Sequence, residues 1–148
     1  MSTIIAPGRE YEQKMREEGC RFCQERWREK AIAASGGWIA VHNEYPRLDA
    51  LFIQPVYQIV LCPIDHIVDE IDENGFIAIG RLRSQLREQL DLTGYGICIR
   101  EGDRLLSGKT VPHIHAHLVV PQTVTLADGS RRASTFNFPV GDRDAPVK

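Results

Sequence analysis

The chain has 148 residues, 43% of them hydrophobic and 26% charged, which suffices for one hydrophobic core and leaves no room for a second full domain. A net charge of −2 and a pI near 6.2 supply no general attraction to polyphosphate backbones, so non-specific nucleic-acid binding is disfavoured. The sequence has no apolar run long enough to span a membrane and does not begin like a signal peptide, so we expect a single cytoplasmic domain over residues 1–148.

Two polar segments open the chain and surround a pair of cysteines. Residues 9–18 are rich in Glu, Arg and Gln and predict a short, solvated N-terminal helix that ends at Gly19. Cys20 and Cys23 follow in a Cys-x-x-Cys arrangement. Residues 24–34 then predict a second helix before the Ser-Gly-Gly breaker. The N-terminal part is therefore expected to be mostly helical.

Short apolar runs over residues 38–41, 50–53 and 57–62 predict strands. The strongest helix pattern follows between Asn74 and Leu92, where apolar residues recur at steps of three and four: Phe76, Ile79, Leu82, Leu86 and Leu90. Asn74 is a plausible N-cap, and Gly94 lies where a terminating glycine is expected.

The second half of the chain reads mainly as strands. Residues 95–100 and 110–120 predict strands separated by a polar loop over residues 101–108. The segment 122–148 reads as a C-terminal tail, with a turn at Asp128-Gly129 inside a short hairpin, and it looks unanchored beyond Phe138. Strands around one long helix predict an α+β domain.

The most informative pattern is a row of histidines, His113, His115 and His117, which alternate with apolar residues. If the segment is a strand, its alternate residues point to opposite faces, so the three imidazoles share one face and stand about 6.6 Å apart along it. Ile114, Ala116 and Leu118 would then pack against the long helix. Such a row fits phosphoryl chemistry on a nucleotide-like substrate.

Two chemistries suit three neighbouring imidazoles. An imidazole acts as a nucleophile or as an acid and base near neutral pH, because its ordinary pKa is about 6.5. It also ligates metals, but a catalytic metal site of this kind usually adds a carboxylate, and the sequence has no Asp or Glu between Asp103 and Asp128. A metal enzyme with all three histidines on one ion is therefore the least favoured alternative.

The run from Gly108 to Pro121 resembles the histidine triad (HIT) signature, His-φ-His-φ-His-φ-φ, in which φ is apolar. The segment from Leu61 to His66 is similar to that family's strand ending in Pro-x-x-His, and together these similarities cover residues 20–121. The resemblance implies an antiparallel sheet of about five strands packed against one long helix. It also implies a homodimer in which the sheets of two protomers join.

The resemblance further implies a nucleotide hydrolase or nucleotidyl transferase that attacks the α-phosphorus of a nucleoside phosphate derivative. His115 corresponds to the nucleophile, with its other ring nitrogen donating to a backbone carbonyl. His117 would contact the phosphate or the leaving group, and His113 would orient the row. Thr110 matches a residue whose hydroxyl contacts phosphate, although an ordinary strand threonine explains it equally well.

The chain departs from the family pattern around the expected substrate site. Lys109 stands where many members have Gln, and Arg100 lies near the place of a phosphate-binding Asn, so both add positive charge. Asn43 resembles a ribose-binding position, but extra residues separate it from the next strand, and Gln58 replaces a usual His. These departures keep a second hypothesis open, namely a regulatory module that binds nucleotide with little turnover.

A Cys-x-x-Cys pair alone is ambiguous among zinc binding, redox chemistry and coincidence. Bacterial proteins of the resembling type pair such cysteines with the His of Pro-x-x-His and with the first histidine of the triad. That similarity selects Cys20, Cys23, His66 and His113 as ligands of a structural zinc. The alternative is that the two cysteines are simply small buried residues and that His66 starts a helix.

Overall fold

The computed structural model describes residues 19–46, 54–109 and 111–141. The predicted helix over residues 9–18 and the predicted strand over residues 50–53 lie outside this part of the chain. The described strands form a five-stranded antiparallel sheet in the order β1-β2-β3-β5-β4 and a separate two-stranded hairpin, β6-β7. The α+β prediction with an antiparallel sheet of about five strands and one long helix is confirmed.

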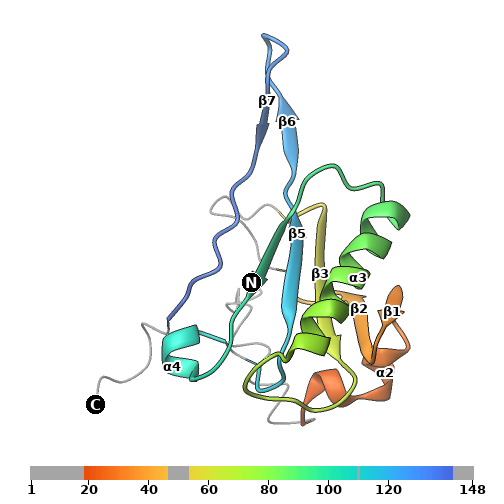
Figure 1. Cartoon of the computed structure of the whole chain (residues 1–148). Helices are drawn as coiled ribbons and strands as arrows, with labels where there is room; N and C mark the ends of the chain where they lie inside the picture. The colour runs from red at the N-terminus through yellow and green to blue at the C-terminus, as the bar shows by residue number, and fades with distance from the viewer. Residues whose placement is uncertain (1–18, 47–53, 110, 142–148) are drawn as a thin grey trace, which may run out of the picture.

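The elements run along the chain in an order that leaves the long helix between the third and fourth strands. Their bounds are η1 (Arg21–Cys23), α2 (Glu25–Arg28), β1 (Ala33–Ser35), β2 (Trp38–His42), β3 (Tyr57–Pro63), α3 (Glu73–Gln89), β4 (Gly96–Ile99), α4 (Arg104–Ser107), β5 (Ala116–Val120), β6 (Thr123–Thr125) and β7 (Arg131–Ala133). Figure 1 shows α3 lying across the sheet and the β6-β7 hairpin projecting from it.

The helix predicted over residues 24–34 is wrong for its second half, which contains β1. Gly36 and Gly37 both have positive φ, at 56° and 78°, and they form the two-residue turn between β1 and β2. Turns of this kind match the twist of a hairpin, and glycine adopts them without a steric penalty. The glycine pair therefore reverses a strand direction instead of ending a helix.

The long helix begins two residues earlier than the predicted N-cap implies, and it ends before Leu92. The side chain of Asp72, instead of that of Asn74, is the N-cap, and it accepts a hydrogen bond from the Gly75 N–H at 2.7 Å. The residue with positive φ after the helix is Asp91, at 53°, and Gly94 does not have this conformation. Phe76 is 49% exposed because it lies roughly a quarter-turn from the buried stripe.

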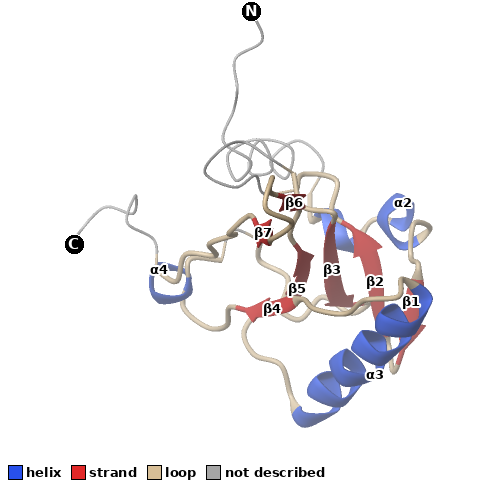
Figure 2. Cartoon of the chain, turned by 90° about the horizontal axis from the view of Figure 1, so that it is seen from above, coloured by secondary structure: helices blue, strands red, loops and turns tan. Residues whose placement is uncertain are grey.

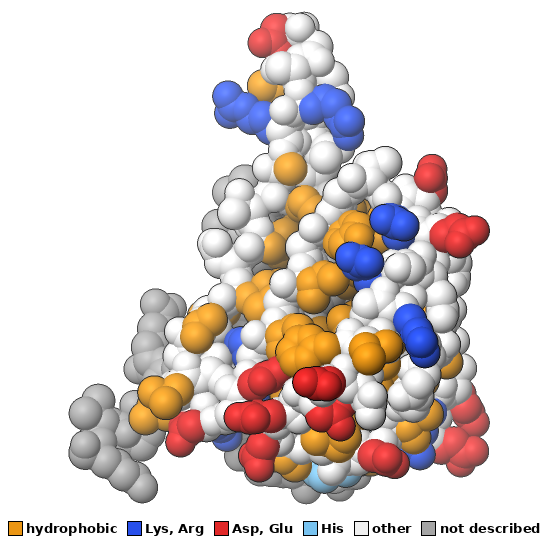
Figure 3. Space-filling view, viewed as in Figure 1, with side chains coloured by type: hydrophobic (Ala, Val, Ile, Leu, Met, Phe, Trp, Pro, Cys, Tyr) orange, Lys and Arg blue, Asp and Glu red, His pale blue; other side chains and the backbone are white. Residues whose placement is uncertain are grey.

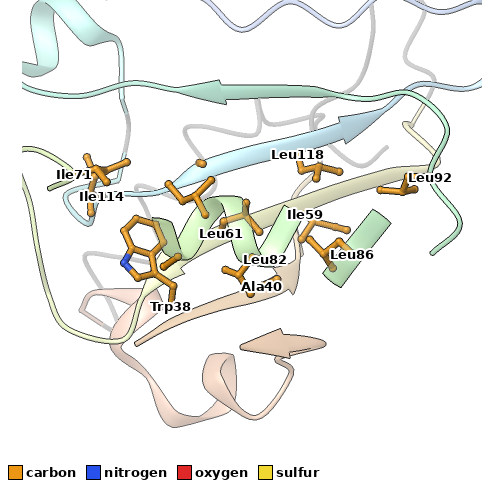
Figure 4. Packing of buried hydrophobic residues seen from close by; sticks show 13 residues of the cluster. Trp38, Ala40, Ile59, Leu61, Ile71, Leu82, Leu86, Leu92, Ile114 and Leu118 are labelled. Atoms are coloured by element: carbon orange, nitrogen blue, oxygen red, sulfur yellow. The ribbon is translucent and has the colours of Figure 1, made fainter. Parts of the chain in front are cut away.

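The main core lies between α3 and one face of the sheet. Its buried side chains include Trp38, Ala40, Ile59, Leu61, Ala78, Ile79, Leu82, Leu86, Ile114, Ala116 and Leu118 (Figure 4). The prediction that Ile114, Ala116 and Leu118 pack against the long helix is confirmed. This packing fixes the height and the orientation of β5, because alternate residues of that strand are held by the core.

A second, smaller core covers the opposite face of the sheet. Phe22 and Trp27, from η1 and α2, pack there against Ile39, Val41, Val60, Cys62 and Val111. Seen from above, α3 and α2 lie on different sides of the strands (Figure 2). The short N-terminal helices therefore cover the same face that carries the even-numbered β3 residues and the odd-numbered β5 residues. No helix among the described residues is long and apolar enough to cross a membrane.

Candidate functional site

The histidine row lies on the sheet face opposite α3, but it is not one continuous strand. The predicted strand over residues 110–120 is wrong at its start, since β5 begins only at Ala116. His117 lies within β5, and His113 and His115 lie in the irregular segment before it. The rings of His115 and His117 approach to 4.8 Å between centroids, closer than the spacing along an ideal strand.

Two edge contacts to one phenyl ring hold the first two histidines. The ring of Phe22 lies edge-on to His113 at 5.6 Å and to His115 at 5.2 Å between centroids. Phe22 comes from the turn between the two N-terminal cysteines, so this turn packs directly against the histidine segment. Such aromatic edge contacts favour one relative orientation of the rings.

The hydrogen bonding of His115 determines which of its ring nitrogens is available. Its Nδ1 lies 2.8 Å from the backbone oxygen of His113. A carbonyl oxygen only accepts hydrogen bonds, so Nδ1 carries the proton and donates it. The lone pair of the neutral ring therefore resides on Nε2. This is the arrangement that the sequence predicted for a nucleophilic His115.

The surroundings of His115 favour its neutral form. Burial lowers the pKa of His115 to about 4, and the nearby charges of Arg100 and Lys109 lower it in the same direction, against the raising effect of the His113 carbonyl. The group is thus uncharged at neutral pH and retains its nucleophilic lone pair. His115 is only 7% exposed, and the Phe22 ring is one of the groups packed against it.

Arg100 and Lys109 are buried cations that are anchored by backbone carbonyls. One nitrogen of the Arg100 guanidinium donates to the Gly108 oxygen at 3.0 Å and to the Pro139 oxygen at 3.2 Å. Nζ of Lys109 donates to the Val68 oxygen at 2.6 Å. Both cations lie close enough to His115 for their charges to lower the pKa of its imidazole.

Gln58 and Phe138 fix the third histidine. Nε2 of Gln58 lies 3.5 Å from Nδ1 of His117 on the neighbouring strand. The Gln58 amide can pair with Nδ1 through its NH₂ group or through its oxygen, so it accommodates this nitrogen with or without a proton. Phe138 stacks on the same imidazole at 5.0 Å between centroids, with an angle of 29° between the rings. These two contacts orient the His117 ring.

The C-terminal segment is attached to the site as far as Gly141, so the prediction that it is unanchored beyond Phe138 is wrong. Pro139 accepts the Arg100 hydrogen bond, and the backbone of Gly141 lies against Gly108. A Cβ on Gly108 would come within 2.7 Å of the Gly141 oxygen, and Gly108 also has φ of +74°. The predicted loop over residues 101–108 contains the short helix α4, and Gly108 is the C-cap of that helix.

Four potential metal ligands gather at the start of the histidine segment. The donor atoms of Cys20, Cys23, His66 and His113 all lie within 4.8 Å of one another. Backbone packing brings them together, since the Ile114 N–H donates to the Ile67 oxygen at 2.6 Å, next to His66. These are the four residues that the family resemblance selected from the sequence as ligands of a structural zinc.

The distances within this cluster fit a tetrahedral ion. The sulfur-to-Nδ1 distances are 3.6 Å for Cys20 to His113, 3.5 Å for Cys23 to His113 and 3.2 Å for Cys23 to His66, and the two Nδ1 atoms lie 3.2 Å apart. Tetrahedral zinc with bonds of about 2.0 to 2.3 Å holds its ligand atoms roughly 3.3 to 3.8 Å apart. The four residues therefore fit a zinc ion.

The protonation of His113 also fits metal ligation. Its Nε2 lies 2.8 Å from the Pro63 oxygen and must donate to it, so the lone pair resides on the Nδ1 that faces the cluster. Burial is the main cause that lowers the pKa of His113, which keeps the ring neutral. In the absence of a cation, burial and the Cys20 thiol raise the pKa of Cys23 to about 11. A bound cation reverses that effect because it stabilises the thiolate.

Asn43 and Thr110 are the remaining residues that were predicted to bind substrate. Asn43 lies at the end of β2, where its N–H donates to the Gln58 oxygen at 2.8 Å and its side-chain oxygen accepts from the Tyr45 N–H at 3.1 Å. Asn43 is thus adjacent to the residue that contacts His117. Thr110 lies outside the described residues. The roles in substrate binding that were expected for both remain predictions.

Three residues of the site were not singled out as functional by the sequence. Gln58 stood only as a departure from the family pattern, and Phe22 and Phe138 carried no local signal. For Gln58, its place in an otherwise apolar strand run was a usable signal, since a buried amide needs a partner. Nothing in the neighbouring residues of Phe138 indicates its contact with His117.

Comparison with known proteins shows the fold. No family model and no curated protein matches the sequence. Among solved structures, a HIT family hydrolase from Clostridium thermocellum superimposes with a TM-score of 0.53 and 22% identity, covering 88% of this chain and 96% of that one. A histidine triad protein from Clostridium difficile superimposes with a TM-score of 0.53 and 14% identity, and the match covers 82% of this chain and 97% of that one. A HIT family hydrolase from Legionella pneumophila superimposes with a TM-score of 0.51 and 16% identity, and the match covers 75% of this chain and 99% of that one. The chain therefore has the histidine triad fold.

Proposed function

We propose that this chain is a nucleotide hydrolase or nucleotidyl transferase that forms a covalent nucleotidyl intermediate on His115. The observation that carries the proposal is the hydrogen bond from Nδ1 of His115 to the His113 oxygen, because it leaves a neutral nucleophilic Nε2. The buried Lys109 ammonium, whose charge reaches His115, attracts an anionic phosphate. The names of the solved structures with the same fold agree with a hydrolase.

In the proposed reaction, Nε2 of His115 attacks the α-phosphorus and forms a P–N bond while the bond to the leaving group breaks. His117, protonated on both ring nitrogens, donates the proton on its Nε2 to the departing atom and is left neutral. Water then attacks the same phosphorus, the P–N bond breaks and His115 regains its lone pair. One water proton returns to His117, and the products are the nucleoside monophosphate and the protonated leaving group.

Mass spectrometry tests the covalent step. The protein is mixed briefly with an adenosine phosphoramidate and, separately, with a diadenosine polyphosphate, and wild type is compared with His115→Ala. We expect a nucleotidyl adduct on His115 that is absent from the variant. Nucleotide binding with neither adduct nor product favours the regulatory module instead.

We further propose that Cys20, Cys23, His66 and His113 hold a structural zinc ion. Support comes from the ligand spacing and from the donor bond of His113 to Pro63, which directs Nδ1 to the cluster. A bound ion links the N-terminal cysteine turn to β3 and to the histidine segment, and it contributes folding free energy. A four-ligand site of this kind has no open position, so the reaction above uses side chains alone.

A homodimer is the proposed assembly. Within the described residues, β4 is the outermost strand of the sheet on its side, and its outer edge has no strand partner. Ile97 of β4 is 38% exposed, and Phe76 and Ile77 of α3 are also exposed. Apolar side chains gather over the region of β4 and α3 in Figure 3. Pairing of two copies along β4 covers this edge. Light scattering on the wild type and on Ile97→Lys checks the assembly, and we expect a dimeric wild type that the variant weakens. A monomeric wild type contradicts the proposal.

A further inference from the structure

A cavity of about 300 Å³ lies on the histidine face of the sheet, between β4, the end of β5 and the C-terminal segment. Its lining is formed by Gly96, Ile97, Cys98, Val119, Pro121, Phe136 and Phe138. None of these side chains carries a charge at neutral pH. The volume is at the low end for small-molecule pockets, so it suits one ring or a short aliphatic chain.

The cavity neighbours His117 through two of its wall residues. Phe138 forms part of its wall and also stacks on the His117 ring. Cys98, another wall residue, is the direct cross-strand partner of His117. The cavity therefore lies next to His117, with Phe138 and Cys98 contributing to both surroundings. It lies on the opposite side of that ring from Gln58, which comes from the strand on the other side of β5.

The position of the cavity beside His117 decides which part of a substrate reaches it. In the proposed reaction His117 protonates the leaving group, so the atoms beyond the departing atom extend past His117 toward these walls. An apolar wall favours an apolar substituent and penalises an ion that loses its water there. The second nucleotide of a dinucleoside polyphosphate carries several negative charges and is unsuited to such a wall.

From this geometry we infer that the cavity binds the leaving group, and that the substrates are nucleoside phosphate derivatives whose leaving group bears an uncharged apolar substituent. The inference rests on the proposed function and deepens it. For a phosphoramidate, the P–N bond to the amine breaks as the bond to His115 forms, and the amine leaves neutral after taking the proton from His117. Water then releases the nucleoside monophosphate.

Two matched substrates test the inference. Adenosine 5′-phosphoramidates of 2-phenylethylamine and of 2-aminoethanesulfonate share the nucleotide and the two-carbon linker, and they differ in whether a phenyl ring or an anion enters the cavity. We expect kcat/KM to be on the order of tenfold or more higher for the phenyl compound. The comparison uses the full chain.

Two variants connect the preference to the cavity. Gly96→Val places a side chain in the cavity, where a Cβ meets nothing within 4 Å, and valine is well accepted in strands. Phe136→Ala removes one wall without touching the stack on His117. Both should reduce the phenyl preference to about threefold or less. Val124→Ala, an exposed site on the β6-β7 hairpin, is the control that keeps the preference.

The outcomes separate the inference from the function beneath it. Equal turnover of the two substrates, a preference for the sulfonate, or a phenyl preference that survives both variants overturns the cavity assignment and leaves the hydrolase proposal standing. Failure to turn over either phosphoramidate or a diadenosine polyphosphate, with no adduct on His115, overturns both. Light scattering on each variant shows whether a change in assembly accounts for the kinetic effect.

Discussion

The two faces of the five-stranded sheet are built from the same strands but differ in what they bury. On the α3 face, β3 and β5 contribute Ile59, Leu61, Ala116 and Leu118, all of them aliphatic. On the other face the same strands contribute Gln58 and His117 beside Val60, Cys62 and Val119. Apolar burial on the first face supplies stability that is independent of the arrangement on the second.

The histidine face shows how polar groups are kept inside a small protein. A buried polar group is costly unless it is hydrogen-bonded, and here Gln58 faces His117, His115 donates to a carbonyl and Arg100 donates to two carbonyls. The carbonyl oxygens that pair with His113 and His115 also fix which ring nitrogen carries the proton. The comparison teaches that the same bonds that make burial of these two histidines tolerable also select their tautomers.

The largest expected effect breaks the histidine face while sparing the core. His115→Ala should lower kcat/KM on the order of a thousandfold or more, because it removes the nucleophile. The free energy of unfolding should fall by no more than about 2 kcal/mol. Steady-state kinetics and urea denaturation measure the two quantities, with His115→Asn as a second variant if the first folds poorly. Turnover near the wild-type rate contradicts the mechanism.

The next effect concerns the metal cluster at the edge of that face. Cys23→Ser should remove one equivalent of zinc and lower the stability by several kcal/mol, because the ion links the cysteine turn to the sheet. Elemental analysis and thermal unfolding check this. Cys98→Ser is the matched control, since Cys98 lies outside the cluster and should leave the metal content unchanged. A wild-type protein purified with zinc supplied, yet without bound metal, contradicts the assignment.

A change on the opposite face should affect stability alone. Leu82→Ala removes a fully buried side chain from the α3 core and should lower the free energy of unfolding by about 2 to 5 kcal/mol. Below the unfolding transition, kcat/KM should stay within about twofold of wild type, since the lesion is separated from the histidines by the sheet. Leu106→Ala, at a residue that is 72% exposed on α4, should change neither quantity measurably. A large kinetic defect in the folded Leu82→Ala protein contradicts the separation of the faces.

The smallest effect sharpens the role of Gln58 as a positioning residue. Gln58→Leu keeps the approximate volume but removes the amide that faces Nδ1 of His117, so kcat should fall about tenfold with little change in KM. The loss should nearly vanish for a nitrophenyl leaving group, which departs without a proton. Gln58→His, whose ring N–H also donates, should restore activity. An equal loss for both kinds of leaving group indicates a merely structural role.

The sequence by itself determined the parts that depend on neighbouring residues. The three- and four-residue apolar steps located α3, and the alternation of His with Ile, Ala and Leu correctly assigned Ile114, Ala116 and Leu118 to the core. The resemblance carried by the histidine segment pointed to the fold and to the Cys₂His₂ set. These features were readable because side-chain direction follows directly from local helix or strand geometry.

Only the tertiary structure decided how the residues of the site are used. It begins β5 at Ala116, and it brings Gln58 and Phe138 to His117. These contacts join segments that are distant in the sequence, so no local pattern encodes them. They are set by the packing of η1 and the C-terminal segment onto one face of the sheet, where the available space and the need to pair buried polar groups select the partners.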